Sequence, residues 1–131
     1  MPDPVCPYCG STASCQDSTV IYGTSYGMSW ICANYPECDS YVGCHRNSRR
    51  PLGRLANKEL RKWKLSAHAA FDPLWKRGLM GRNEAYRWLA AQLKIKVHKC
   101  HVGMFDVETC KRVVELSRGY KSMQEHYHVE T

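Results

Sequence analysis

The chain has 131 residues, enough for one small domain or for one domain with a zinc module. Its composition, 24% charged and 44% hydrophobic, excludes a disordered chain. No apolar run approaches the ~20 residues of a membrane span. The N-terminus, MPDPVCPYCG, lacks the basic and apolar regions of a secretory signal, so we expect a cytoplasmic protein without membrane contact. In that setting the paired cysteines among the eight are expected to bind metal rather than to form disulfides.

The net charge of +7 is distributed unevenly along the chain. Residues 1–45 carry −4, residues 46–64 carry +7, and residues 65–131 carry +4. A basic stretch of this density is typical of a nucleic-acid-binding surface, and a solvated helix face is the alternative interpretation. The basic side chains expected to contact phosphates are Arg46, Arg49, Arg50, Arg54, Lys58, Arg61 and Lys62.

The first third of the chain, residues 1–45, shows no helical periodicity. Residues 18–22 and 28–32 are rich in Val, Ile, Tyr and Trp and predict two short strands. Residues 23–27, with glycine at both ends, predict the hairpin loop between them. Residues 41–43 predict a third strand.

The composition changes after this segment. Residues 46–54, which combine Arg, Pro, Gly and Ser, predict a linker. Apolar residues at helical spacing predict a helix over 55–71, which ends near Asp72 because the next residue is proline. We expect the Asp72 side chain to cap a short helical turn over 73–77.

Two further helices are predicted over 83–94 and 107–118. Asp106 is the expected N-cap of the second, and Gly119 is expected to end it. The remaining residues, 120–131, predict a mobile tail. The expected helical core consists of Trp63, Phe71, Leu74, Trp75, Trp88, Leu89, Leu93, Val113 and Leu116.

Four cysteines have the spacing of a zinc site. Cys6 and Cys9 form C-x2-C, and after 22 residues Cys32 and Cys38 form C-x5-C. Each pair lies at a predicted tight turn, and a hairpin between them brings the pairs together. Four thiolates then surround one tetrahedral Zn²⁺ at about 2.3 Å. A segment this small needs the metal to fold, so the zinc is expected to be structural.

The segments CPYCG and WICANYPECDSYVGC resemble the four-cysteine zinc ribbons of bacterial type I topoisomerases. Nothing resembles the catalytic domains of those enzymes, so no strand passage is implied. The resemblance implies that ribbon aromatics, among them Tyr26, Trp30 and Tyr35, stack on bases of single-stranded DNA. Because residues 1–45 are acidic, we expect the ribbon to stack while the basic stretch contacts phosphates.

Three later segments, AHAAFDPLWK, RNEAYRWLAAQL and CHVGMFDVETC, resemble a zinc-finger-containing family of bacteria and their phages. This resemblance implies the architecture and the setting and brings no reaction with it.

The other cysteines and histidines are more consistent with packing than with metal binding, since Cys110 lies on the apolar face of a predicted helix. A second metal site is the less favoured interpretation of Cys15 with Cys44 and His45, or of His98, Cys100, His101 and Cys110.

The sequence therefore predicts a small α+β protein, with a four-cysteine zinc ribbon (1–45), a basic linker (46–54), a compact helical domain of three to four helices (55–119) and a tail (120–131). The favoured function is non-catalytic, sequence-tolerant nucleic-acid binding, with DNA preferred to RNA.

Two alternatives belong to other classes. The first is a protein–protein adaptor, for instance phage-encoded, that docks on host replication or transcription machinery. The second is a metal-dependent hydrolase, which requires His98, His101 and Asp106 to converge in a cleft.

Overall fold

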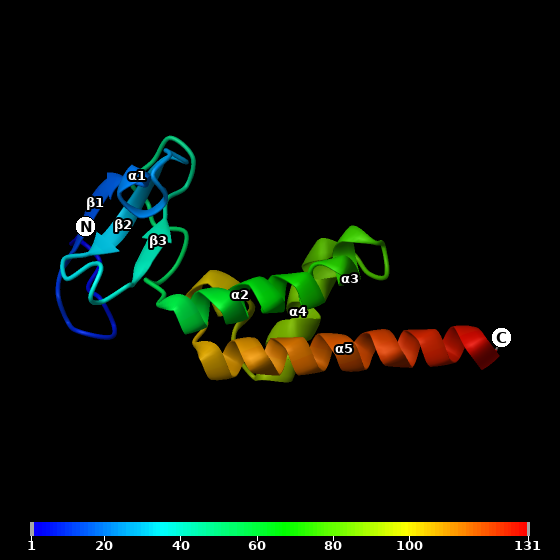
Figure 1. The fold of residues 1–131 in the computed structure, drawn as a ribbon. Coiled ribbons are helices and arrows are strands. Elements are labelled where there is room, and N and C mark those ends of the chain that lie inside the picture. Colours follow the sequence, from blue (N-terminus) through cyan, green and yellow to red (C-terminus); the bar gives the residue numbers. More distant parts are fainter. Residues whose placement is uncertain (1, 131) are drawn as a thin grey trace. The chain divides into compact units, whose positions relative to one another are not determined.

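The computed structural model describes the backbone of residues 2–130 and the side chains of residues 2–124. The chain forms two compact units, Met1–Arg61 and Lys62–Thr131. The first contains a three-stranded antiparallel sheet and the second is helical, so the architecture is α+β as predicted (Figure 1). Within the described part of the chain, no helix is both long and apolar enough to span a membrane.

The sheet has the order β1-β2-β3, with β1 (Ala13–Asp17), β2 (Met28–Cys32) and β3 (Tyr41–Gly43). Ala13 pairs with Cys32 across β1 and β2, and Ser29 pairs with Gly43 across β2 and β3. The central strand β2 is buried from its second residue onward, which explains its apolar sequence. The strands predicted over 28–32 and 41–43 are confirmed.

The strand predicted over 18–22 is wrong. These residues form the short helix α1 (Thr19–Tyr22), and the strand that pairs with β2 precedes it. The Asp17 carboxylate accepts hydrogen bonds from the Thr19 N–H at 2.9 Å and from the Ser25 hydroxyl at 2.9 Å. These local side-chain bonds turn the backbone out of the sheet, and they outweigh the β-propensity of Val and Ile.

Residues 46–54 are not a linker, because they form part of the first unit. Cys44 pairs with Pro51 in an antiparallel bridge, and the Leu52 N–H donates to the Gly43 carbonyl at 2.9 Å. Residues 45–50 thus close a loop, which we call the arginine hairpin. The first unit extends past the predicted boundary at residue 45 and includes the buried Leu55.

Helix α2 (Lys58–Phe71) begins three residues later than predicted and ends at the expected position. The Asn57 side-chain oxygen accepts the Leu60 N–H at 3.0 Å, so Asn57 supplies the missing cap. The short helix α3 (Pro73–Lys76) follows directly. The expected capping of α3 by the Asp72 side chain is wrong, since this carboxylate instead lies 3.2 Å from His68 Nδ1.

The second half of the helical unit contains α4 (Arg82–Leu93), the 3₁₀ turns η1 (Val97–Lys99) and η2 (Val102–Met104), and α5 (Val107–Glu130). The helix predicted over 83–94 is confirmed within one residue at each end.

The start of α5 is confirmed, because Asp106 Oδ1 accepts the Thr109 N–H at 2.8 Å. The predicted end at Gly119 is wrong: α5 continues to Glu130 and absorbs residues 120–130 of the expected tail. Tyr120, directly after the glycine, packs edge-to-face on Trp88 at 5.3 Å between ring centroids. This tertiary contact outweighs the roughly 1 kcal/mol that glycine costs inside a helix.

The core of the helical unit is formed by Phe71, Leu74, Leu89 and Val113, all fully buried as expected. The other predicted core residues are half-buried and line its margin: Trp63, Trp75, Trp88, Leu93 and Leu116.

Candidate metal centre and nucleic-acid interface

The first cysteine pair lies on a tight knuckle before β1. The Cys6 N–H donates to the Ser11 carbonyl at 2.8 Å, and the Gly10 N–H donates to the Cys6 carbonyl at 3.0 Å. Gly10 has φ of 78°, a left-handed conformation that a residue with a Cβ adopts only at a cost. The C-P-x-C-G sequence therefore specifies the turn that presents both thiols to the same side.

The second pair lies on a knuckle that follows β2. The Tyr35 N–H donates to the Cys32 carbonyl at 3.0 Å, and the Cys38 N–H donates to the Asn34 carbonyl at 3.0 Å. Because Cys32 ends the central strand and pairs with Ala13 of β1, the sheet holds this knuckle beside the first.

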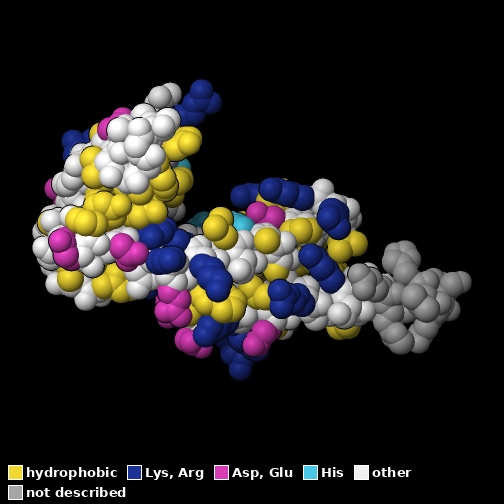
Figure 2. All heavy atoms as spheres, in the orientation of Figure 1, with side chains coloured by type: hydrophobic (Ala, Val, Ile, Leu, Met, Phe, Trp, Pro, Cys, Tyr) yellow, Lys and Arg dark blue, Asp and Glu magenta, His cyan; other side chains and the backbone are white. Residues whose placement is uncertain are grey.

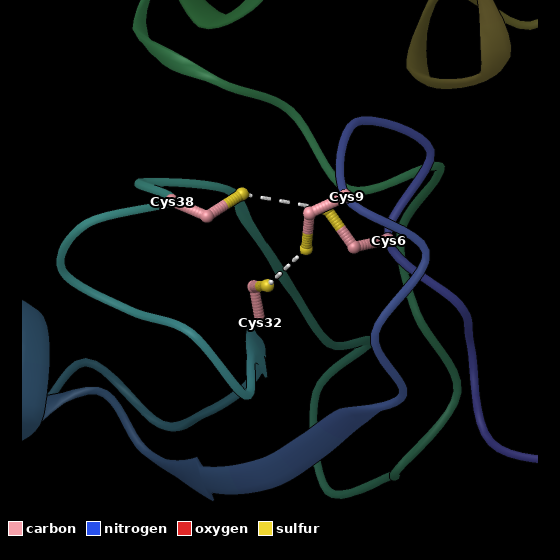
Figure 3. A group of neighbouring side chains, drawn as sticks. All are labelled: Cys6, Cys9, Cys32 and Cys38. Atoms are coloured by element: carbon pink, nitrogen blue, oxygen red, sulfur yellow. Dashed lines mark hydrogen bonds between the residues drawn. The ribbon is translucent and has the colours of Figure 1, made fainter.

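The four thiols converge on one point (Figure 3). Their sulfur atoms all lie within 4.8 Å of one another, with Cys6 Sγ 3.6 Å from Cys38 Sγ and Cys9 Sγ 3.4 Å from Cys32 Sγ. A tetrahedral Zn²⁺ with Zn–S bonds of about 2.3 Å requires sulfur separations of roughly 3.8 Å. The donor set and the geometry therefore fit one structural zinc ion, as predicted.

Neighbouring polar groups donate hydrogen bonds to these ligands and favour the thiolate form of Cys6 and Cys9. The Ser40 hydroxyl lies 3.0 Å from Cys6 Sγ, and Asn34 donates its backbone N–H to Cys32 Sγ at 3.4 Å and its side-chain amide to Cys9 Sγ at 3.5 Å. Hydrogen bonds from Ser11 and Asn34 lower the pKa of Cys9 to about 6, whereas burial raises the pKa of Cys32 to about 12. Sequence reasoning missed Ser40, and the S/T-rich flanks of the cysteines gave no specific signal for it.

The family model of a zinc-finger-containing domain matches residues 3–120. The chain belongs to this family. Its zinc-finger description agrees with the four-cysteine cluster, so the protein binds zinc. No curated protein and no solved structure matches this member of the family.

The basic residues predicted to contact phosphates belong to both units, and some are exposed whereas others are half-buried. Arg46, Arg49 and Arg50 lie exposed on the arginine hairpin. Lys58 and Lys62 are exposed on α2, with Lys62 belonging to the second unit. Arg54 is half-buried.

Arg61 is held inside the first unit and is not free to contact phosphate as predicted. Its Nη1 donates to the Asp39 carbonyl at 2.7 Å and to the Ala56 carbonyl at 2.6 Å, and its Nη2 lies 3.3 Å from the Asp39 carboxylate. The guanidinium carbon also stacks 4.0 Å from the Tyr41 ring centroid. A side chain with these donors engaged is structural.

Of the predicted stacking residues, Trp30 is also corrected. Its side chain is only 5% exposed because β2 is the central strand, so a base cannot stack on it. The indole N–H instead donates to the Arg49 carbonyl at 2.6 Å. Trp30 therefore anchors the arginine hairpin.

Tyr26 is 78% exposed and begins a row of tyrosines in edge-to-face contact. It lies 5.5 Å from Tyr22, which lies 6.1 Å from Tyr41, which in turn lies 6.2 Å from Tyr35. Tyr35 is half-buried and retains part of its surface. Hydrophobic side chains visibly gather on this unit in the space-filling view (Figure 2).

A groove of about 560 Å³ joins the most exposed tyrosine to the arginine hairpin. The segment from Tyr26 to Met28, which we call the Tyr26 loop, forms one wall, and the arginine hairpin forms the other. Asn47 and His45 also line the groove. Sequence reasoning missed Asn47 because it treated residues 46–54 as a linker, and it considered His45 only as a ligand of a second metal site. The lining residues are Tyr26, Gly27, Met28, Cys44, His45, Arg46, Asn47, Ser48 and Arg49.

The residues considered for a second metal site have other environments. Cys100 and Cys110 are 1% and 0% exposed, and burial raises the pKa of each thiol to about 11. His98 and His101 are exposed. Among residues 2–124, the groups of three or more potential ligands within reach of one ion comprise the Cys6 cluster alone, so His98, His101 and Asp106 do not form one.

Proposed function

We propose that the protein binds single-stranded nucleic acid through its zinc-stabilised first unit, with DNA as the preferred form. The observation that carries the proposal is the groove between Tyr26 and the arginine hairpin. It puts an exposed aromatic ring beside exposed guanidinium groups, the two features that sequence-tolerant binders of single strands combine.

The arginine hairpin also offsets the negative charge of residues 1–45, which by itself would repel a phosphate backbone. Residues 1–61 contain six basic and five acidic side chains, and a zinc ion held by four thiolates adds a formal charge of −2. The unit as folded therefore carries −1, whereas residues 1–45 with the same zinc site would carry −6. Asp17, close to the Tyr26 loop, is engaged with Thr19 and Ser25. Arg46 and Arg50 form no ion pair with a carboxylate among the described residues, and their guanidinium groups are available to phosphate oxygens.

In this proposal a base stacks on Tyr26 while the flanking phosphates contact Arg46 and Arg49. Stacking on one aromatic ring contributes roughly 1–3 kcal/mol per base and is independent of sequence. The zinc ion takes no part in ligand contact. It holds the knuckles, and through β2 it fixes Trp30 and the hairpin that Trp30 anchors.

The test is fluorescence anisotropy of the zinc-loaded protein with labelled 12-nucleotide single-stranded DNA, the matching duplex, and single-stranded RNA. We expect single strands to bind more tightly than the duplex. In a plot of the logarithm of the binding constant against the logarithm of the salt concentration, each phosphate contact contributes ~0.7 to the slope. The variant R46Q/R49Q/R50Q should therefore reduce the slope by about 2. The matched control R77Q/R112Q/R118Q removes three exposed arginines from the helical unit and should leave the slope unchanged.

The aromatic contribution is tested separately. Tyr26→Leu should weaken binding about tenfold, whereas Tyr26→Phe, which keeps the ring, should bind as the parent protein does. Absence of binding to all three nucleic acids at about 50 mM salt would refute the proposal. The exposed tyrosine row would then be tested as a docking surface for a protein partner.

A further inference from the structure

The helical unit contains a pocket that the proposed function does not use. Its volume is about 320 Å³ and its wall contains no carboxylate. The lining residues are Arg82, Asn83, Tyr86, Arg87, Val97, Cys100 and His101. We propose that this pocket binds a phosphate group.

Two segments of the chain build the pocket. On α4, Arg82 and Tyr86 are four residues apart, as are Asn83 and Arg87, so the four side chains share one face of the helix. Helix α4 packs against η1, and the segment that follows η1 supplies His101. Cys100 is 1% exposed and belongs to the closed floor, while the polar groups surround the opening.

Arg82 is held in place by two aromatic rings. Its guanidinium carbon lies 5.4 Å from the Trp75 ring centroid and 5.0 Å from the Tyr86 ring centroid. Stacking uses the faces of the guanidinium, and apart from its hydrogen bond to the Tyr86 hydroxyl the in-plane N–H donors are available to an acceptor. A donor that is already restricted loses less conformational entropy when a ligand binds.

The charge around the pocket favours an anion. Arg82 and Arg87 form no ion pair with a carboxylate within the described side chains. Lys94, Lys96 and Lys99 lie in the segment that leads into and through η1, and residues 94–101 contain no Asp or Glu.

The carboxylate of Asp72 has an electrostatic effect on Tyr86 in the pocket wall. It already faces His68 at 3.2 Å and Lys76 at 3.9 Å. The field in the pocket is therefore positive, and it attracts anions before any contact forms.

Phosphate is the anion that these donors fit. Two guanidinium forks, a side-chain amide, a phenol and an imidazole offer more donors than one carboxylate accepts, and they match an anion with three or four acceptor oxygens. The phosphate has two sources, the backbone of a nucleic acid or a small phosphorylated molecule. The same oxygens are recognised in both.

The test is a titration of the full-length, zinc-loaded, ¹⁵N-labelled protein carrying R46Q/R49Q/R50Q, which removes the proposed nucleic-acid site. Inorganic phosphate and a 12-nucleotide deoxythymidine strand are the two probes. We expect the Nε resonances of Arg82 and Arg87 to shift with at least one probe. The backbone amide resonances of these two arginines and of residues 97–101 should shift with them. A response to the strand alone would identify the backbone of a nucleic acid as the ligand. A response to inorganic phosphate would show that a small phosphorylated molecule is enough to occupy the pocket.

Arg87→Gln in the same background should weaken the response about tenfold, since it removes charge-assisted hydrogen bonds. Arg87→Lys keeps the charge without the fork and should give an intermediate loss. Arg118→Gln, which removes an exposed arginine from α5, should leave the affinity unchanged. Because Arg87 is exposed, these variants are expected to fold, which the dispersion of the remaining resonances checks. Unshifted pocket resonances with both probes, or equal losses in Arg87→Gln and Arg118→Gln, would overturn the proposal.

Discussion

Trp30 and Arg49 are joined by two contacts. The indole N–H donates to the Arg49 carbonyl at 2.6 Å, and the Arg49 guanidinium carbon lies 5.5 Å from the indole ring centroid. The first contact fixes the backbone of the arginine hairpin and the second holds a side chain that lines the groove. A tryptophan of the sheet core thus connects the zinc-stabilised fold to the exposed surface.

This relationship predicts different results for two Trp→Phe changes. Trp30→Phe keeps a buried ring but leaves the Arg49 carbonyl without its donor, so we expect a loss of about 1–2 kcal/mol in the free energy of unfolding of the first unit. Trp75→Phe removes an indole N–H that is buried without a partner among the described residues, so we expect no loss.

Urea unfolding measures both changes, with zinc release reporting on the first unit and helical circular dichroism on the second. Equal losses from the two variants would show that ring size, and not the hydrogen bond, determines the effect.

Arg61 supplies a prediction that separates a structural arginine from a phosphate contact. Arg61→Lys cannot reproduce the fork that reaches the Asp39 and Ala56 carbonyls, so we expect the first unit to lose about 1–3 kcal/mol of stability. At temperatures where this variant is folded, the salt slope of nucleic-acid binding should equal that of the parent. Arg50→Gln is the control with the opposite result, a reduced slope at unchanged stability. A reduced slope in Arg61→Lys would return Arg61 to the set of phosphate contacts.

Tyr41 makes the stability of the first unit sensitive to alkaline pH. Burial, followed by the neighbouring Tyr22 hydroxyl, raises the pKa of Tyr41 from 10.0 to about 12. The folded state therefore favours the neutral phenol. Its contribution to stability is complete below pH 10 and is lost as the pH rises toward 12.

Absorbance at about 295 nm should show late ionisation from Tyr41 and also from Tyr86, whose pKa burial raises as well. The late component should become smaller, by the absorbance of one tyrosine, in Tyr41→Phe. The phenylalanine variant keeps the ring beneath Arg61 and should lose less stability than the parent between these pH values. Ionisation of every tyrosine near pH 10 would contradict the buried environment of Tyr41.

The zinc site was predictable because its chemistry is local. Cysteine spacing, together with Pro and Gly at the knuckles, determines how each pair is presented, and one hairpin brings the pairs together. Ser40 was not predictable, because its hydroxyl reaches Cys6 across 34 positions of sequence. The pocket on the helical unit was missed for the same reason: it needs α4 and the segment after η1 to be placed together.

The arginine hairpin was mistaken for a linker because turns and linkers have the same composition. Gly, Pro, Ser and Asn are common in both. Two contacts distinguish the hairpin from a linker, the β-bridge between Cys44 and Pro51 and the hydrogen bond from the Trp30 indole to the Arg49 carbonyl. The sequence therefore predicted which residues are basic, and the structure determined which of them are exposed and which share a groove with Tyr26.

The cysteines allow a matched pair of variants for the zinc site. Cys9→Ser removes one of four ligands, and we expect the zinc content to fall from one ion per chain to well below one. Because the metal supplies folding free energy to so small a unit, the variant should also lose the dispersed amide resonances of β1 to β3. Cys15→Ser changes a half-buried thiol on β1 that lies outside the cluster, and it should retain both the zinc and the sheet.

Metal analysis after gel filtration measures the zinc, and nuclear magnetic resonance measures the sheet. Chelation of zinc from the parent protein should reproduce the Cys9→Ser spectrum while the helical resonances of α4 and α5 persist, because these helices belong to the other unit. Loss of zinc from Cys15→Ser, or a sheet that survives chelation unchanged, would contradict a structural role for a single ion bound by Cys6, Cys9, Cys32 and Cys38.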